Sequence, residues 1–294
     1  MSFRTGWIRL LPAAALSPML AGCGMLRGAA TSALAPMAAQ MSASLQEQTD
    51  PDLVRDGAPA LILMLDGFAA SAPDNPEILL AAAAARVGYA SAFIDRAEAA
   101  RARDLYARAR DYGIAALSRN ARFRAAVSGP IDAFEASLAG FGTADVPALY
   151  TTATAWMGWI INSGGAMEAV AQIGRPVAMM RRVMALDPSH EHGGPHLFFG
   201  IYYAVQPRGG GGDLAASRRH LDQAMAAAGD GALLPRVALA EFYARYSLDQ
   251  ELFVKTLRAV VDSREKDDPP GLRLMNAVAR RRAKALLPMA DEWF

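Results

Sequence analysis

Apolar residues recur along this chain at helical spacing, and capping residues or prolines end each run. The first such stripe consists of Leu34, Met37, Ala38, Met41 and Leu45. Residues at these intervals share one face of an α-helix. Asp50-Pro51 interrupts the pattern, and Asn75-Pro76 starts a later run by placing an N-cap residue before a proline at the first helical position. Because no segment of sequence shows convincing two-residue alternation, the pattern predicts helices and no sheet.

The composition of the chain also favours helices. Alanine dominates the 53% of residues that are hydrophobic, and Ala, Leu, Met, Arg and Glu are all good helix formers. The 294 residues can bury a substantial core in one large domain or two small ones. The main helices expected from stripes and caps span 75–93, 97–117, 146–161, 166–186, 195–205, 213–228, 234–246, 249–263 and 271–287, with a less regular insertion at 119–145.

A short motif recurs within these helices: a small residue, a large apolar or aromatic residue four positions later, and a small residue three positions further. It occurs at Ala102-x3-Tyr106-x2-Ala109, at Ser217-x3-Leu221-x2-Ala224 and, more loosely, at Phe253-x3-Leu257-x2-Val260. Small residues let two helices approach closely, and the large residue fills the groove of the next pair. The repeat interval is close to the ~34 residues of tetratricopeptide (TPR) repeats. We therefore predict an all-α fold, an irregular TPR-like array of antiparallel helix pairs (an α-α superhelix), in a single domain over 34–294.

The N-terminus has the features of a bacterial lipoprotein signal peptide over residues 1–22. Arg4 and Arg9 supply positive charge, and residues 10–20 are apolar but too few to span a bilayer as a helix. Leu20-Ala21-Gly22-Cys23 resembles a lipobox, and Cys23 is the only cysteine of the chain. We therefore expect Cys23 to be lipidated and residues 23–33 to form a tether; a buried helical cysteine is the alternative. Gly24 resembles the residue that follows the cysteine in lipoproteins sent to the outer membrane.

Three stretches of the chain resemble the T-component of TRAP transporters, the TatT family of helical lipoproteins. The first runs from Asp50-Pro51-Asp52-Leu53 to Tyr89-Ala90-Ser91-Ala92-Phe93; the second joins Tyr150 and Ala155-Trp156-x-x-Trp159 to Leu186-Asp187-Pro188 and Gly193-Gly194-Pro195-His196; the third runs from Leu274-x-Asn276 to Asp291-Glu292-Trp293-Phe294. Their order and spacing cover nearly all of the expected mature chain. One departure is Thr151, where many members of the family carry an aromatic residue beside the tyrosine.

This resemblance implies an accessory role in transport. Members of the family are thought to work beside the periplasmic solute-binding subunit of a tripartite ATP-independent periplasmic (TRAP) transporter, and an internal apolar channel implies a hydrophobic small-molecule ligand. We expect a periplasmic protein, lipid-anchored to the inner leaflet of the outer membrane, with a homo-oligomer left open. The alternative is a generic TPR scaffold lipoprotein of an outer-membrane or secretion assembly.

Aromatic residues offer candidates for a ligand cavity. Trp156 and Trp159 lie on one helix face, and Phe199 and Tyr203 belong to an aromatic-rich segment that also contains His196. Aromatic rings at this density can line a ligand site, with the polar tips of Tyr and Trp orienting the ligand. Ordinary core packing is the alternative that apolar helix stripes favour.

A basic run near the C-terminus is a candidate for partner docking. Arg280, Arg281, Arg282 and Lys284 lie late in the last expected helix, where cations complement the helix dipole. A solvated face is the default interpretation, and a patch formed by Arg280, Arg281 and Lys284 is the functional one.

Other patterns argue against further chemistry. His190, His192 and His196 do not have the spacing of a helical zinc motif, and the glycine run at 209–212 lacks the Lys and Ser/Thr of a phosphate-binding loop. A net charge of +1 gives no reason to expect nucleic acid as a partner. The sequence contains no recognisable nucleophile motif or acid pair. We expect no enzyme activity, no metal and no cofactor.

Overall fold

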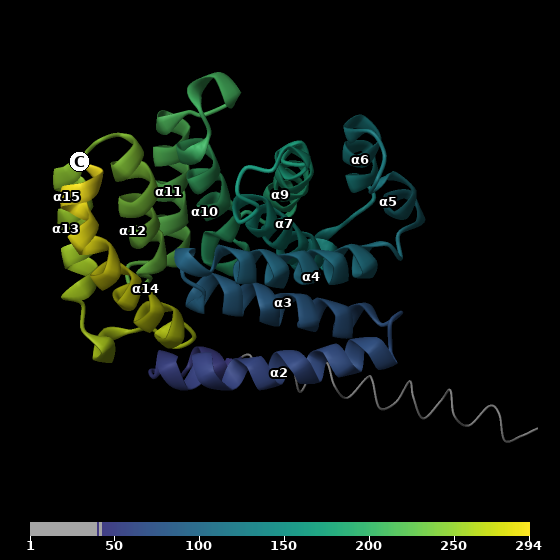
Figure 1. Ribbon diagram of the computed structural model, residues 1–294, viewed down its shortest axis with the longest axis horizontal. Coiled ribbons are helices and arrows are strands. Elements are labelled where there is room, and N and C mark those ends of the chain that lie inside the picture. Colours follow the sequence, from purple (N-terminus) through teal and green to yellow (C-terminus); the bar gives the residue numbers. More distant parts are fainter. Residues whose placement is uncertain (1–39, 41–42) are drawn as a thin grey trace, which may run out of the picture.

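The computed structural model describes residue 40 and residues 43–294, and this part of the chain is all-α without strands (Figure 1). Its α-helices are α2 (Pro51–Ser71), α3 (Pro76–Phe93), α4 (Ala99–Leu117), α5 (Ala121–Ala126), α6 (Ile131–Leu138), α7 (Val146–Ile161), α8 (Met167–Val170), α9 (Gly174–Leu186), α10 (His190–Val205), α11 (Leu214–Ala228), α12 (Leu234–Ala238), α13 (Gln250–Val261), α14 (Arg273–Leu286) and α15 (Ala290–Trp293). Short 3-10 turns occupy Arg96–Glu98, Thr143–Asp145, Arg208–Gly210, Glu265–Asp267 and Leu287–Met289. The predicted fold class is confirmed.

Side-chain caps start several helices where the sequence predicts them. The Asn75 side chain accepts from the backbone N–H groups of Glu77 and Ile78, at 3.0 and 3.2 Å, at the start of α3. The carboxylates of Asp213 and Asp249 accept in the same way at the starts of α11 and α13. These bonds satisfy amide groups that the first helical turn leaves unpaired, so local sequence fixes these boundaries.

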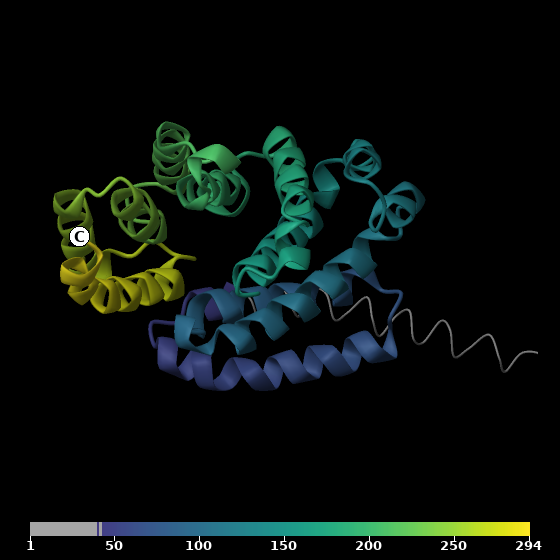
Figure 2. The same cartoon turned by 45° about the horizontal axis from the view of Figure 1, so that its top comes forward.

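The helices follow one another as neighbouring pairs around a curved path. The layer of α2, α3 and α4 lies along one side, α7 and α9 pack beyond α4, and α10 pairs with α11 (Figure 1). The chain then turns back through α12, α13 and α14, and α14 contacts α2 (Figure 2). Short connections between neighbouring helices make them antiparallel pairs, which is consistent with the TPR-like array expected from the sequence.

The largest apolar core lies where α6, α7 and α9 meet. Phe123, Phe134, Leu149, Met179 and Met180 are fully buried there. Close approach of α4 to α7 depends on a small residue, since a Cβ on Gly158 would come within 2.6 Å of the Tyr106 ring. The tyrosine is the large residue of the first predicted motif, and it fills a groove on the next helix as the motif predicts.

The two ends of the described chain meet at α14. Val54 of α2 packs with Leu274 and Val278 of α14 in one buried cluster. Arg281 of α14 pairs with Asp52 of α2 at 2.6 Å. Helix α14 therefore packs against α2, and the last helices of the array lie next to the first (Figure 2).

Several predicted elements were wrong in detail. The expected helix over 166–186 is broken into α8 and α9 by a turn at 171–173. Pro176, in the first turn of α9, explains the break, because its ring would clash with the carbonyl of residue 172 in a continuous helix. The insertion at 119–145 contains the short helix α5, which the apolar pattern of this segment does not indicate. No side chain caps α7, and the Asp145 carboxylate accepts from the Gly142 N–H at 2.8 Å.

The helix expected over 234–246 changes type along its length. It begins as α12 and continues as a π-helix over Leu239–Ala244. Wider π turns are rare and occur mostly as short bulges inside α-helices. Nothing in the residue pattern of this segment explains the change.

The start of α10 is strongly kinked. Glu191, His192 and Gly193 all have positive φ, at 48°, 56° and 82°. Left-handed backbone is costly for residues with a Cβ, so regular helix begins only at about Gly194-Pro195, as the sequence predicts. Burial of the neighbouring Tyr150 hydroxyl raises its pKa to about 12.

The lipoprotein features lie outside the described residues. These are the signal peptide, Cys23, the tether, and most of the helix expected over 34–45. Within the described residues, no helix has the length and apolar character needed to cross a bilayer.

Candidate functional site

Trp156 and Trp159, expected to line a cavity, belong instead to packed surroundings. Trp156 is buried against Phe134 in the main core, and its indole N–H donates to Gln172 at 3.0 Å. Trp159 is half-buried, and the Arg110 guanidinium lies 4.4 Å from its ring centre. Packing and cation–π contacts therefore account for both side chains.

The other aromatic candidates form a cluster between α10 and α11. Phe199 is buried, and Tyr203 stacks on it with ring centres 6.0 Å apart. His220 of α11 stacks on Tyr203 and lies tilted against Phe199. His196 reaches His220 across the interface, with the two Nδ1 atoms 3.0 Å apart. Only one of these nitrogens can donate, so at least one ring is neutral in this arrangement. Burial lowers the pKa of both histidines, and the His196 and Arg219 charges lower that of His220 further.

The three histidines of the sequence motif do not converge on one point. His196 pairs with His220 on the next helix, whereas His190 packs on Tyr150 and lies 3.8 Å from the Asp187 carboxylate. In the described part of the chain, no group of three or more His, Cys, Asp or Glu side chains could hold a metal ion. The pairing partner of His196 was not predicted because it lies 24 residues away on another helix.

Arg280 departs from the expectation of an exposed basic patch. Its side chain is 8% exposed and makes two hydrogen bonds to Asp268, at 2.5 and 2.9 Å, and one to Ser263 at 2.9 Å. Sequence position alone suggested a solvated face, but the facing loop supplies a buried carboxylate that draws the guanidinium inward. Arg280 is therefore unavailable for docking.

The remaining members of the basic run differ from one another. Arg281 is exposed and pairs with Asp52, and Lys284 is exposed on the same helix. Arg282 is half-buried and pairs at 2.8 Å with Glu241, a buried carboxylate that Arg96 also contacts. Of the predicted patch, Arg281 and Lys284 face solvent.

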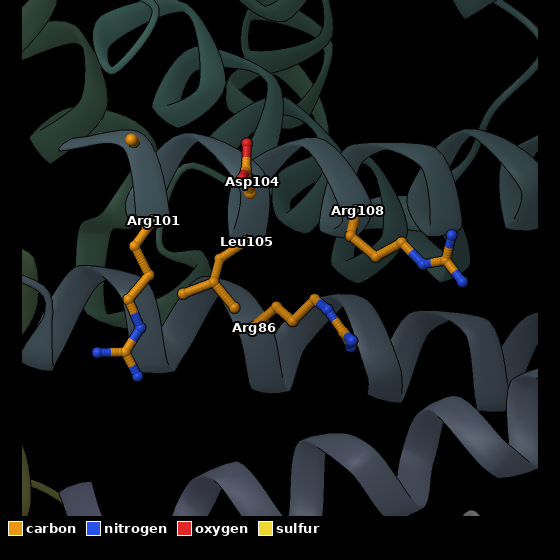
Figure 3. A pocket seen from close by; sticks show the side chains of 6 residues that line it. Arg86, Arg101, Asp104, Leu105 and Arg108 are labelled. Carbon is orange, nitrogen blue, oxygen red and sulfur yellow. The ribbon is translucent and has the colours of Figure 1, made fainter. Parts of the chain in front are cut away.

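An open cleft of about 510 Å³ lies elsewhere, along α3 and α4. Arg86, Arg101, Asp104, Leu105 and Arg108 line it together with Ala100. Figure 3 shows the side chains of Arg101 and Leu105 extending from α4 toward α3, the helix that carries Arg86. Asp104 points to the other side of α4 in the same view. None of the residues predicted for a ligand cavity contributes to this cleft.

The arginines of this cleft differ in how they are paired. Arg86 is buried and contacts Asp66 of α2, whose other oxygen accepts from Tyr112 at 2.7 Å. Arg101 pairs with Glu98 at 3.0 Å and donates to the Tyr89 hydroxyl. Among the described residues, Arg108 makes no salt bridge, and its guanidinium lies 5.1 Å from the Tyr112 ring centre. Interaction with the Tyr112 hydroxyl raises the pKa of Arg108, so the Arg108 guanidinium stays charged.

The sequence indicates one side of this cleft but not the other. Arg101, Leu105 and Arg108 lie on one helix face at intervals of four and three residues. Arg86 comes from the preceding helix, and no local pattern links it to them. A second, smaller cleft of about 370 Å³ runs between the start of α3, the end of α4 and the start of α7.

Comparison with known proteins identifies the family. A family model described as TRAP transporter T-component (TAtT) matches residues 47–294, which include every helix from α2 to α15. No curated protein matches the chain. The chain therefore belongs to the TRAP transporter T-component family, which is a family of transport accessory components and not of enzymes.

Proposed function

We propose that this chain is a lipid-anchored, periplasmic accessory protein of a TRAP transport system that binds the solute-binding subunit. The observation that carries the proposal is the family match over 47–294, which extends across the whole closed array of helices. Curved arrays of helix pairs present extended surfaces suited to binding another protein. The lipobox at Cys23 supports an anchor, and Gly24 supports the outer membrane as its destination.

The exposed cations of α14 are the surface we propose for docking. Arg281 and Lys284 remain accessible, and Arg281 sits where the two ends of the array meet. Charges at the rim of an interface mainly speed association and select partners. Reversing both charges, Arg281→Glu with Lys284→Glu, should therefore weaken binding, whereas Lys255→Glu with Arg258→Glu on the neighbouring α13 provides a control with the same change of charge.

The aromatic cluster does not enter this proposal. Trp156 is packed in the core and donates to Gln172, and Trp159 lies under the Arg110 guanidinium. Phe199 and Tyr203 stack on each other, and His196 pairs with His220. The contacts give no support to a hydrophobic solute at these residues.

Co-purification tests the proposal. The tagged full-length chain is expressed in its native host, and detergent-solubilised membranes are passed over the tag resin. The expected result is recovery of the solute-binding subunit of a TRAP system. Recovery of outer-membrane or secretion assembly subunits without that protein would favour the scaffold alternative instead. Palmitate labelling of the wild type and of Cys23→Ala tests the anchor separately, because label retained by the variant would exclude Cys23 as the lipidated residue.

A further inference from the structure

We propose that the cleft along α3 and α4 binds an organic anion with an apolar body. The acidic group would contact Arg86 and Arg108, and the apolar body would lie on Leu105. This inference goes beyond the proposed function, because a ligand can occupy the cleft whether or not the solute-binding subunit binds elsewhere.

Uncompensated positive charge is the first argument. Arg86 and Arg108 lie on the same side of Leu105 in Figure 3, and Asp66 is the one carboxylate paired with either of them among the described residues. Two guanidinium groups facing one carboxylate leave a net positive charge at this end of the cleft. Asp104, the acidic residue of the lining, points away and is paired with Arg103 at 3.0 Å.

Spare hydrogen-bond donors are the second argument. A guanidinium carries five N–H donors. Arg86 uses one amino group on Asp66 and the other on the Ala82 carbonyl at 3.5 Å, a long contact. Arg108 donates to no carboxylate among the described residues. Guanidinium donors at fixed positions recognise carboxylate, sulfonate and phosphate groups well.

The shape and lining of the cleft select the rest of the ligand. Its volume is about 510 Å³ and it is open to solvent, so a bound ligand would keep part of its surface exposed. Leu105 and Ala100 supply apolar surface, and Arg101 flanks Leu105 on the side opposite Arg86 and Arg108. A small inorganic anion would leave that apolar surface uncovered, whereas a neutral hydrophobe would leave the Arg108 guanidinium without an anionic partner among the described residues.

Arg86 also has a structural role, which decides the choice of variants. Through Asp66 and Tyr112 it links α2, α3 and α4, so replacing it would disturb the packing of three helices. Arg108 is exposed and makes no salt bridge in the described chain, so Arg108→Gln removes ligand contacts at little cost to folding. Arg103→Gln is the matched control, because Arg103 is an exposed arginine of the same helix outside the cleft lining.

A pair of fluorescent probes with nearly the same aromatic body tests the proposal on the purified chain. 1-Anilinonaphthalene-8-sulfonate carries one negative charge, and N-phenyl-1-naphthylamine carries none. We expect saturable binding of the sulfonate that decanoate displaces and 1-decanol does not. Loss of one charge-assisted contact in Arg108→Gln should weaken sulfonate binding about tenfold, and Arg103→Gln should leave it unchanged. Raising the salt concentration from low to molar should weaken it further.

The same titrations can overturn the proposal. Absence of saturable sulfonate binding to the wild type would do so, as would equal affinities in Arg108→Gln and Arg103→Gln. Equal affinity for the neutral probe would show that the site is merely apolar. Circular dichroism and thermal unfolding of each variant ensure that a change in affinity is not a change in folding. A failed co-purification with the solute-binding subunit would leave these outcomes unaffected.

Discussion

The α14 interface and the α10–α11 interface hold the array together by different means. At α14, Arg280 and Asp268 form a buried ion pair, and Asn276 completes the network by donating to Asp268 at 2.8 Å. Between α10 and α11, Gly200 lets the helices approach, and the Ser217 hydroxyl donates to the Gly200 carbonyl at 2.7 Å. The closing helix thus adds a buried ion pair to its apolar contacts, whereas the regular pair depends on small residues.

This difference has a physical origin. The α10–α11 pair follows the repeated motif, in which a small residue faces a large one and no charge needs desolvation. The last helix instead meets an irregular loop and the first helix of the array, and polar groups there must find partners to be buried. The comparison predicts that single substitutions at the two interfaces differ in cost and in their response to pH and salt.

The largest expected effect is at Arg280. Arg280→Met leaves the Asp268 carboxylate, with a side chain only 5% exposed, without its cation. Removing one partner of a buried ion pair typically costs about 3–5 kcal/mol of unfolding free energy. Urea denaturation measures the loss. The double variant Arg280→Met with Asp268→Leu should recover much of it, and a single-variant cost below about 1 kcal/mol would contradict a structural role for the pair.

A methyl group at Gly200 should have the next largest effect. In Gly200→Ala the new Cβ would lie 2.6 Å from Leu221 Cγ, so α10 and α11 must separate. Overpacking of this kind costs about 1–3 kcal/mol. The control is Gly88→Ala in α3, where no atom lies within 4 Å of the added Cβ and where alanine favours the helix by up to about 1 kcal/mol. If both variants are equally stable, the close approach at Gly200 is unimportant.

Acid should weaken the α10–α11 interface through its histidine pair. The folded-state pKa values of His196 and His220 are lowered by burial, so the folded chain binds fewer protons than the unfolded chain. Their contribution to stability is therefore present above the unfolded pKa of about 6.5 and is lost as pH falls below it. Thermal unfolding between pH 7.5 and 5 measures this. In the double variant His196→Gln with His220→Gln, the unfolding temperature should fall less steeply between pH 7.5 and 5. If it falls as steeply as in the wild type, the histidine pair is not the cause of the acid sensitivity.

The smallest expected effect is at the exposed pair that joins the array's ends. Arg281→Ala removes a contact to Asp52 between side chains that are 51% and 59% exposed. Exposed ion pairs contribute little to stability and are screened by salt. The unfolding free energy should therefore change little in dilute buffer and not at all in molar salt. A loss as large as that of Arg280→Met would mean that ionic contacts at α14 act as one unit.

The same contrast explains what the sequence could predict. Caps at Asn75, Asp213 and Asp249 and the bounds of α7 depend on neighbouring residues, so they were predictable. The burial of Arg280 depends on a loop carboxylate 12 residues away, and sequence position suggested the opposite.

The candidate site was harder to predict than the fold. The arginine cleft needs Arg86 from one helix beside Arg108 from the next, and helix periodicity does not fix which faces meet. The break before α9 follows from Pro176, whereas the apolar stripe over 166–186 continues through it.

Direct binding of the purified solute-binding subunit tests the central claim, that this TRAP T-component engages that subunit. Titration calorimetry with the full mature chain should give saturable binding of fixed stoichiometry. The charge-reversed Arg281→Glu, Lys284→Glu variant should bind more weakly, and the Lys255→Glu, Arg258→Glu variant should bind as the wild type does. No detectable binding of the wild type at high protein concentration would contradict the account.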